Sequence, residues 1–250
     1  MSEELITQKP EKTVLERLRQ HREMLVAAGA VAVSSMVLGA SVARGERHVQ
    51  PIKPGKAVAQ FIQSHDYYFK EMKLDSHKIE NKEAFKAWVQ DQLQNNQRVA
   101  EFGKTPDQMD SKELVQAAGL ITAENLKYSW DQDANAATDR QPMDNILMEH
   151  LPAECETYVA TQQAVFGVMK EMFPSQLANT YLVEHEVDGA VSHFVNAVVE
   201  LQSPNAVSVY FSDPTAMDPD WKHPAHALKE AVDSTPLAQE LQKQGVEVNS

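Results

Sequence analysis

The sequence contains a single cysteine in 250 residues, so no disulfide can form within the chain, and cysteine content favours neither an oxidising nor a reducing compartment. It has no long block of basic residues, and its formal net charge is -13. Nucleic-acid-binding proteins neutralise phosphates with clustered Lys and Arg, so this balance argues against nucleic acid as a partner. Internal repeats and low-complexity tracts are absent. The single cysteine is therefore either a buried residue that serves only packing or a reactive group.

The remaining composition is that of an ordinary globular protein. Hydrophobic residues make up 42% and charged residues 24% of the chain. A length of 250 residues leaves room for one substantial domain with extensions. We therefore expect a packed core, with the excess of acidic residues on a solvated surface.

The N-terminal part of the chain predicts a membrane segment. Residues 1–23 are polar and predict a helix, and residues 24–43 carry no charge. As a helix, the uncharged segment would span roughly 30 Å, the thickness of a hydrocarbon core. A membrane anchor is the favoured interpretation, which would place the rest of the chain outside the cytoplasm, in a bacterial periplasm. A cleaved secretory signal, giving a secreted protein, and a buried helix are the alternatives.

Most of the following stretch predicts helices. Residues 44–55 contain two prolines and two glycines and are typical of a linker. Apolar residues then recur at helical spacing through residues 56–125, which predicts a helical subdomain. They are Val58, Phe61, Ile62, Tyr68, Phe85, Trp88, Val89, Leu93, Leu114, Ala118 and Ile121.

A catalytic core is expected over residues 126–233. Between residues 130 and 140 the chain is polar and loses its period, which predicts a solvated loop, and Pro142 is well placed to open a short helix. The acids of this loop lack the spacing of a calcium loop, and residues 217–224 match no strong metal template. We therefore expect neither metal nor cofactor. Residues 234–250 are expected to form a C-terminal tail of surface helix with a fraying end.

Cys155 opens an amphipathic helix. Residues at three- and four-residue intervals after it form one face, up to the stop near Pro174. They are Val159, Gln162, Val165, Phe166, Met169 and Met172. In the first turn of a helix, a thiolate is favoured by the helix dipole and by unpaired backbone N–H groups. The position alone does not distinguish a reactive cysteine from an inert one.

Three strands are expected after this helix. Residues 181–187, 191–201 and 207–211 alternate or run apolar, with turns at Asp188-Gly189 and at Ser203-Pro204-Asn205. A hairpin centred on residue 203 or 204 places His193 opposite residue 213 or 215. Asp213 then lies opposite His193, or one diagonal step away on the same face, within hydrogen-bonding reach.

Cys155, His193 and Asp213 are therefore the candidate catalytic residues. A cysteine nucleophile needs a base to accept its proton, and an imidazole base needs a third group that fixes its tautomer and stabilises its charged form. The candidate donors for an oxyanion hole are the backbone N–H of Cys155 and the side chains of Gln141 and Trp130.

These motifs resemble a known family. The stretch Glu154-Cys155-Glu156-Thr157-Tyr158, followed by Ser192-His193-Phe194-Val195 and Ser212-Asp213-Pro214-Thr215, is similar to the bacterial transglutaminase-like cysteine proteinases. The resemblance covers roughly residues 120 to 220 and implies an α+β fold with a papain-like, transglutaminase-like core. In that core a helix bearing cysteine packs on an antiparallel sheet bearing histidine and aspartate. It also implies that Cys155 is the nucleophile, His193 the general base and acid, and Asp213 the orienting residue.

The sequence therefore predicts a membrane-anchored, thiol-dependent acyl transferase, with hydrolysis of a peptide or amide bond favoured over crosslinking. Its expected partners are a protein or peptide substrate and the membrane. Ala153-Glu154 stands where family members usually carry a glycine, and Glu154 and Glu156 place negative charge beside the thiol. These departures favour the alternative, a non-catalytic, membrane-tethered binding module with a degenerate site.

Overall fold

A computed structural model describes four stretches of the chain, and from residue 47 onward the chain forms one compact unit. The stretches are residues 51–64, 79–187, 193–219 and 235–249. Within them no helix is long and apolar enough to cross a membrane. The predicted anchor at residues 24–43, the preceding helix at residues 1–23 and the predicted turn at Asp188-Gly189 lie outside the described residues.

The centre of the fold is a four-stranded sheet in the order β3-β4-β5-β6. The strands β3 (Thr180–Val187), β4 (His193–Ser203) and β5 (Ala206–Ser212) run antiparallel, as the sequence predicts. The fourth strand, β6 (Glu247–Asn249), pairs parallel to β5. The sheet is therefore mixed, whereas the sequence predicts a purely antiparallel sheet. The protein is thus an α+β fold.

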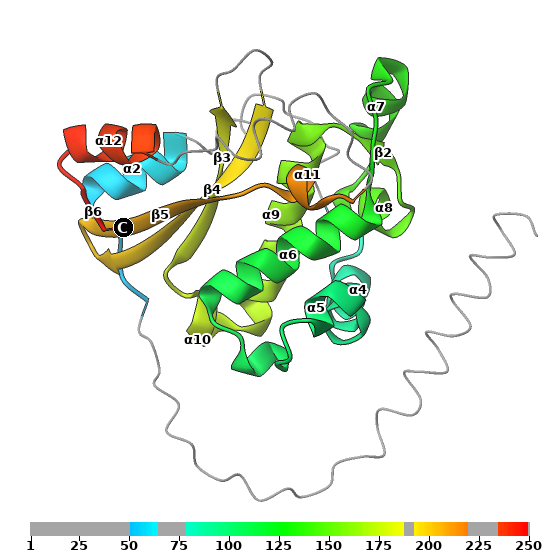
Figure 1. Ribbon diagram of the computed structural model, residues 1–250, viewed down its shortest axis with the longest axis horizontal. Coiled ribbons are helices and arrows are strands. Elements are labelled where there is room, and N and C mark those ends of the chain that lie inside the picture. Colours follow the sequence, from blue (N-terminus) through cyan, green and yellow to red (C-terminus); the bar gives the residue numbers. More distant parts are fainter. Residues whose placement is uncertain (1–50, 65–78, 188–192, 220–234, 250) are drawn as a thin grey trace, which may run out of the picture. The chain divides into compact units, whose positions relative to one another are not determined.

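The sheet is buried on both faces, with alternate residues packing into two separate cores. Val198 belongs to the core on one face, with Leu182 and Tyr210 packed against that core. Val199 and Val207 belong to the core on the opposite face. Because β4 lies between β3 and β5 and is covered on both sides, most of its residues are buried. Figure 1 shows helices on the two sides of the sheet.

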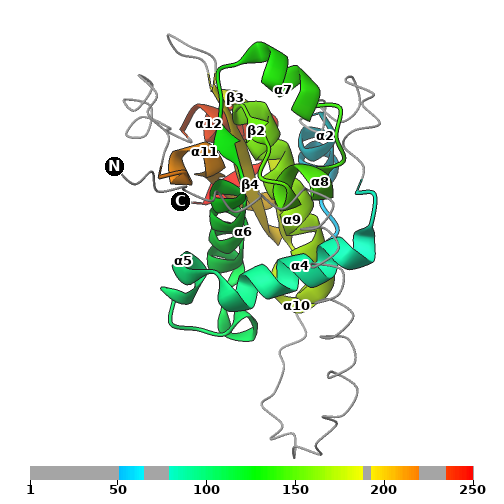
Figure 2. The same cartoon turned by 90° about the vertical axis from the view of Figure 1, so that its right-hand side faces the viewer.

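The larger core lies between the sheet and a layer of helices. Its centre is α9 (Cys155–Met172), which contacts both β3 and β4 and packs along α6 (Ser111–Asn125), as Figure 2 shows. Asp110 begins α6 with a capping box, in which its side chain and that of Glu113 each accept the other residue's backbone N–H. The remaining helices of this layer are α4 (Lys82–Asn95), α5 (Gln97–Ala100), α8 (Met143–Met148) and α10 (Pro174–Leu177).

The smaller core unites the first and last described helices. α2 (Lys56–Ser64) contacts α12 (Thr235–Lys243), and Leu237 and Leu241 of α12 are buried against the sheet. The predicted C-terminal tail over residues 234–250 contains α12 as its helix, and its apolar residues Leu237 and Leu241 complete this core. The expected helical subdomain over residues 56–125 is no separate unit, since α2 packs in this core and α4 and α6 pack in the other.

The polar stretch after Trp130 is a helix rather than the predicted solvated loop. α7 (Gln132–Thr138) starts where Asp131 Oδ1 accepts the backbone N–H groups of Asp133 and Ala134. Asn135 Nδ2 donates to the carbonyl of Ser129, so the polar residues serve as caps and anchors of the helix. The flanking segments β1 (Lys127–Tyr128) and β2 (Pro152–Ala153) form a short parallel pair.

Candidate active site

Cys155 is the first residue of α9, as the sequence predicts. It follows directly on β2, in which Ala153 pairs with Tyr128 of β1, so the chain entering the helix is held by backbone pairing. The thiol is partly exposed. At this position the backbone N–H has no partner within the helix and remains oriented along the helix axis. The geometry thus gives the sulfur both access and the positive end of the helix dipole.

His193 and Asp213 are hydrogen-bonded to each other, as the hairpin register implies. Asn196 pairs with Ser212. In the same register Asp213 lies opposite Val195, and therefore one diagonal step from His193. His193 Nε2 donates to Asp213 Oδ2 over 2.8 Å, and the two side chains are only 6% and 13% exposed. Exclusion of water strengthens such a charge-assisted bond.

Asp213 has a second structural role, because it is also the N-cap of the short helix α11 (Pro214–Met217). Its Oδ1 accepts the backbone N–H of Ala216 over 3.1 Å, while its Oδ2 accepts from His193. The two carboxylate oxygens are therefore divided between the helix cap and the imidazole. This division fixes the orientation of the carboxylate and, through it, that of the ring.

Cys155 and His193 share a side-chain hydrogen bond, which brings all three predicted residues together. Burial opposes protonation of His193 most strongly. Hydrogen bonds and charge interactions with Asp213 and Cys155 outweigh burial and raise the pKa of His193 to about 9. At neutral pH the ring is thus held as imidazolium beside the thiol, the form that stabilises a thiolate.

A network of buried amides fixes α9 on the sheet. Gln162 Nε2 donates to Ser212 Oγ over 2.7 Å, and Gln162 Oε1 accepts from Asn196 Nδ2 at the same distance. Asn196 Nδ2 also donates to the carbonyl of Val159, and its Oδ1 accepts from Gln163 Nε2. These hydrogen bonds connect α9, which carries Cys155, to β4, which carries His193, and to β5, which is followed by Asp213. They therefore set the distance across the site.

The segment after Asp213 is anchored from both α9 and α5. Tyr158, fully buried in the second turn of α9, donates its hydroxyl to Asp218 Oδ2 over 2.6 Å. Arg98 Nη1 donates to the carbonyl of Met217. Met217 also packs closely over Gly119 of α6, where an added Cβ would lie 2.6 Å from the methionine sulfur. The absence of a side chain at Gly119 therefore lets α11 seat close to α6.

Carboxylates surround the thiol on several sides. Burial, a hydrogen bond with Glu154 and the charges of Glu154, Asp139 and Glu186 raise the pKa of Glu156 to about 7. Glu184 on β3 is 8% exposed, and burial together with the charges of Glu156 and Glu186 raises its pKa to about 8. Within the described part of the chain, its Oε2 has no hydrogen-bond partner. These acids thus lie close enough to oppose one another's ionisation.

Tyr128 is a residue near the site that the sequence reasoning missed. Burial raises the pKa of its phenol well above the ordinary range, and the charges of Cys155, Glu154, Glu156 and Asp213 raise it further. The hydroxyl is thus kept protonated as a donor. Trp130, 59% exposed, packs edge-on against Tyr128, and Gln141 is exposed just beyond α7. The oxyanion role of these two side chains stays a prediction.

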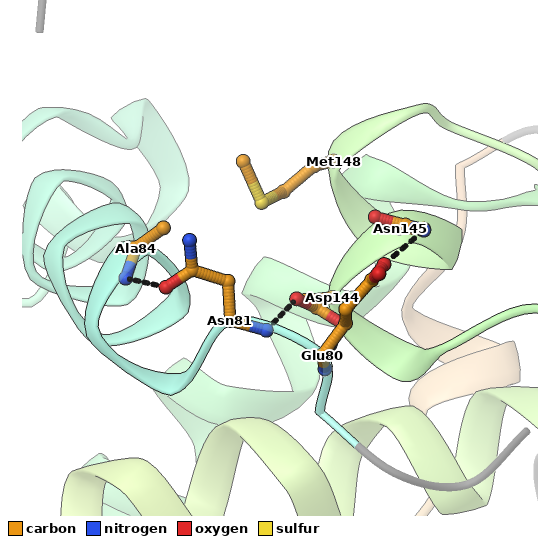
Figure 3. Close-up of a pocket in the computed structure, with 6 residues that line it drawn as sticks. All are labelled: Glu80, Asn81, Ala84, Asp144, Asn145 and Met148. Atoms are coloured by element: carbon orange, nitrogen blue, oxygen red, sulfur yellow. Dashed lines mark hydrogen bonds between the residues drawn. The ribbon is translucent and has the colours of Figure 1, made fainter. Parts of the chain in front are cut away.

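The structure also has a hollow that contains none of the predicted site residues. It encloses 420 Å³ and lies where Glu80 and Asn81 meet Asp144 and Asn145, as Figure 3 shows. The Asp144 carboxylate accepts the backbone N–H groups of Glu80 and Asn81, and Asn145 donates to Glu80. These polar groups hold two segments of chain together. Among the described residues, no group of three or more His, Cys, Asp or Glu is arranged to hold a metal ion.

The site residues that the sequence analysis missed carried weak signals. Gln162 stood out only as a polar residue on the apolar face of α9, and Glu184 as an acid inside a strand. Neither reveals its environment until β3 and α9 are placed side by side. No family model, curated protein or solved structure matches the chain.

Proposed function

We propose that the protein is a thiol-dependent acyl transferase that hydrolyses a peptide or amide bond with Cys155, His193 and Asp213. One observation carries the proposal: a buried imidazole is hydrogen-bonded to Asp213 over 2.8 Å and to the thiol of Cys155. A nucleophile, a base and an orienting carboxylate linked in this order are the parts that cysteine hydrolases use. We also propose that α9 and the β3-β4-β5 sheet form a transglutaminase-like core of the papain-like type.

The reaction follows from the positions of these groups. The thiolate of Cys155 attacks the carbonyl carbon, and the tetrahedral intermediate collapses as the C–N bond breaks. His193 gives its proton to the departing amine, which leaves a thioester on Cys155. Water then attacks the carbonyl carbon of the thioester while His193 takes a proton from the water. The C–S bond breaks, the carboxylic acid is released, and the thiolate–imidazolium pair is restored. The backbone N–H of Cys155 and the hydroxyl of Tyr128 are the donors proposed for the oxyanion.

Alkylation of Cys155 tests the proposal without a known substrate. Iodoacetamide at pH 6 to 7 should label Cys155 on the order of 100-fold faster than a model thiol such as glutathione, because His193 maintains the thiolate. The variant His193→Ala should lose this advantage. His185→Ala is the matched control, since His185 lies on the neighbouring strand and stacks on Phe211 outside the triad. Its labelling should equal that of the wild type.

The same measurement decides between the two functional classes. If Cys155 in the wild type reacts no faster than glutathione, and His193→Ala changes nothing, the protein is a binding module with an inactive site. Circular dichroism spectra of the variants must match that of the wild type, so that unfolding is not mistaken for loss of activation.

We propose in addition that residues 24–43 anchor the protein in a membrane, with the described unit on the extracytoplasmic side. The support is the uncharged length of this segment. Fractionation of cells expressing the full chain should place it in the membrane pellet, and a chain lacking residues 1–43 should move to the soluble fraction. Full-length protein in the soluble fraction would contradict the anchor and agree with a buried helix, whereas soluble protein that lacks the N-terminal segment would agree with cleavage.

A further inference from the structure

The carboxylates beside Cys155 belong to two elements that flank the proposed triad. Glu154 and Glu156 are the direct neighbours of the thiol at the start of α9. Glu184 and Glu186 lie on β3, where Glu186 pairs with Phe194, the residue next to His193. The charges of Glu154 and Glu186 both act on Glu156, so the acids of the two elements lie near one another.

Glu184 shows that this cluster differs from an ordinary solvated acidic surface. Its side chain is more than nine-tenths buried, and its Oε2 has no hydrogen-bond partner among the residues that the structure describes. The charges of Glu156 and Glu186 raise the pKa of Glu184, so the three side chains lie near one another. A buried carboxyl oxygen without a hydrogen-bond partner destabilises the folded state, and the fold keeps this oxygen beside other acids. Such a group is expected where a ligand completes the site.

The group that would pair with Glu184 Oε2 should be a cation at the end of a long, flexible side chain. No group of three or more acidic, histidine or cysteine side chains among the described residues is close enough to hold a metal ion, which disfavours a compact divalent cation. A lysine ammonium or an arginine guanidinium carries several N–H donors at the end of a long side chain, and it can bridge carboxylates that are farther apart.

We propose that Glu156, Glu184 and Glu186 form a subsite for a lysine or arginine side chain of the substrate, next to the bond that Cys155 attacks. This inference rests on the proposed function, and it adds the substrate class: basic peptides. A cationic side chain in this subsite would donate to the buried Oε2 of Glu184 and offset the repulsion between the carboxylates. Peptides with an acidic or neutral residue at the same position would leave both costs in place.

Peptide acyloxymethyl ketones provide the test with the full-length protein. Cys155 displaces the carboxylate leaving group and forms a thioether, so each probe reports how well its side chain is accepted. The probes carry arginine, lysine, citrulline, norleucine or glutamate, at the residue next to the ketone in one series and one residue further in a second. The measurement is the second-order rate constant for modification of Cys155, followed by mass spectrometry.

We expect the arginine or lysine probe of one series to react about tenfold faster than its citrulline or norleucine counterpart, equivalent to about 1.4 kcal/mol. The ratio of arginine to citrulline rates should fall toward one in Glu184→Gln and in Glu156→Gln. A ratio cancels any change in thiol reactivity that these variants cause. Glu171→Gln is the matched control, because Glu171 is an acid near the opposite end of the same helix and should leave the ratio unchanged.

Equal rates for arginine and citrulline probes in both series would overturn the subsite. So would a preference that Glu184→Gln and Glu156→Gln leave intact, or one that calcium chloride suppresses more than sodium chloride of equal ionic strength, because the carboxylates would then bind a metal. Failure of the proposed function is seen separately, as loss of the His193-dependent reaction with iodoacetamide. The probe ratios still report the subsite in that case.

Discussion

Two regions of α9 bury polar groups, and they do so in opposite ways. Around Gln162 the amides of α9 and β4 satisfy one another, with donors and acceptors matched across the helix–sheet contact. Near the start of α9 the acids Glu154, Glu156, Glu184 and Glu186 oppose one another's ionisation, and Glu184 Oε2 has no hydrogen-bond partner in the described stretches. Matched groups hold the scaffold together. Buried polar groups that lack a hydrogen-bond partner in the folded protein are typical of a site that another molecule completes.

The largest expected effect breaks the matched region. Asn196→Leu removes the donor to Val159 and Gln162 and the acceptor for Gln163 while keeping a similar volume. The Val159 carbonyl and the side-chain amides of Gln162 and Gln163 would then lose hydrogen bonds in a buried contact. This loss should lower the free energy of unfolding by about 3 kcal/mol. Urea denaturation followed by circular dichroism measures this value.

The control for this substitution is Gln202→Leu, on the same strand. Gln202 is exposed, and its amide bonds only to Ser208 at the surface. Its replacement should change the free energy of unfolding by less than about 0.5 kcal/mol. If both variants lose the same small amount, the amide network is not what holds α9 on the sheet.

The next effect has the opposite sign and sharpens the unmatched region. The pKa of Glu184 is raised to about 8 by burial and by neighbouring acids, so its ionisation opposes folding. This cost is absent below pH 4.5, grows as pH rises through 8, and is constant above. Glu184→Gln should therefore stabilise the protein by about 2 kcal/mol at pH 9 relative to wild type, and much less at pH 5.

Glu247→Gln is the control for this pH dependence, because Glu247 is an exposed acid on β6. Its effect on the free energy of unfolding should be small and equal at both pH values. A Glu184→Gln variant that is less stable than wild type at pH 9 would show that the carboxylate has a stabilising partner.

The smallest effect concerns the triad itself. The pKa of His193 is raised from 6.5 to about 9, against the effect of burial, by Asp213 and Cys155. The stability from this protonation is fully present below pH 6.5 and is lost as pH rises through 9. Asp213→Asn should reduce this loss by about 1 kcal/mol between pH 6 and pH 10. Urea titrations at the two pH values, wild type against Asp213→Asn, give the difference. An equal loss in both proteins would contradict the charge-assisted bond.

The sequence predicts the parts of the site that depend on local pattern and on strand register. The start of α9 at Cys155 follows from apolar spacing, and the contact of His193 with Asp213 follows from the position of one turn. Both are observed. The contact between Cys155 and His193 depends on how a helix docks on a sheet, which spacing does not give. It was expected only because a cysteine nucleophile needs a base, and because of the family resemblance.

The features that the sequence analysis missed share a physical cause, the use of polar or short segments in packing. The stretch around Asp131 looked like a solvated loop because capping residues also favour turns, and here they start α7. The segment of α12 and β6 looked like a tail because it is mostly polar. Its few apolar residues, among them Leu237 and Leu241, find a core only where α2 provides the facing surface.

The distribution of the triad over α9, β4 and the turn after β5 has a consequence during folding. Cys155 lies among helical neighbours that form by local contacts, whereas His193 reaches it only after the strands have paired and docked on α9. Before that step the thiol has two glutamates as neighbours and no imidazole within reach. An incompletely folded chain would therefore carry an ordinary thiol. Under the proposed function, fast alkylation of Cys155 would report that the native state has formed.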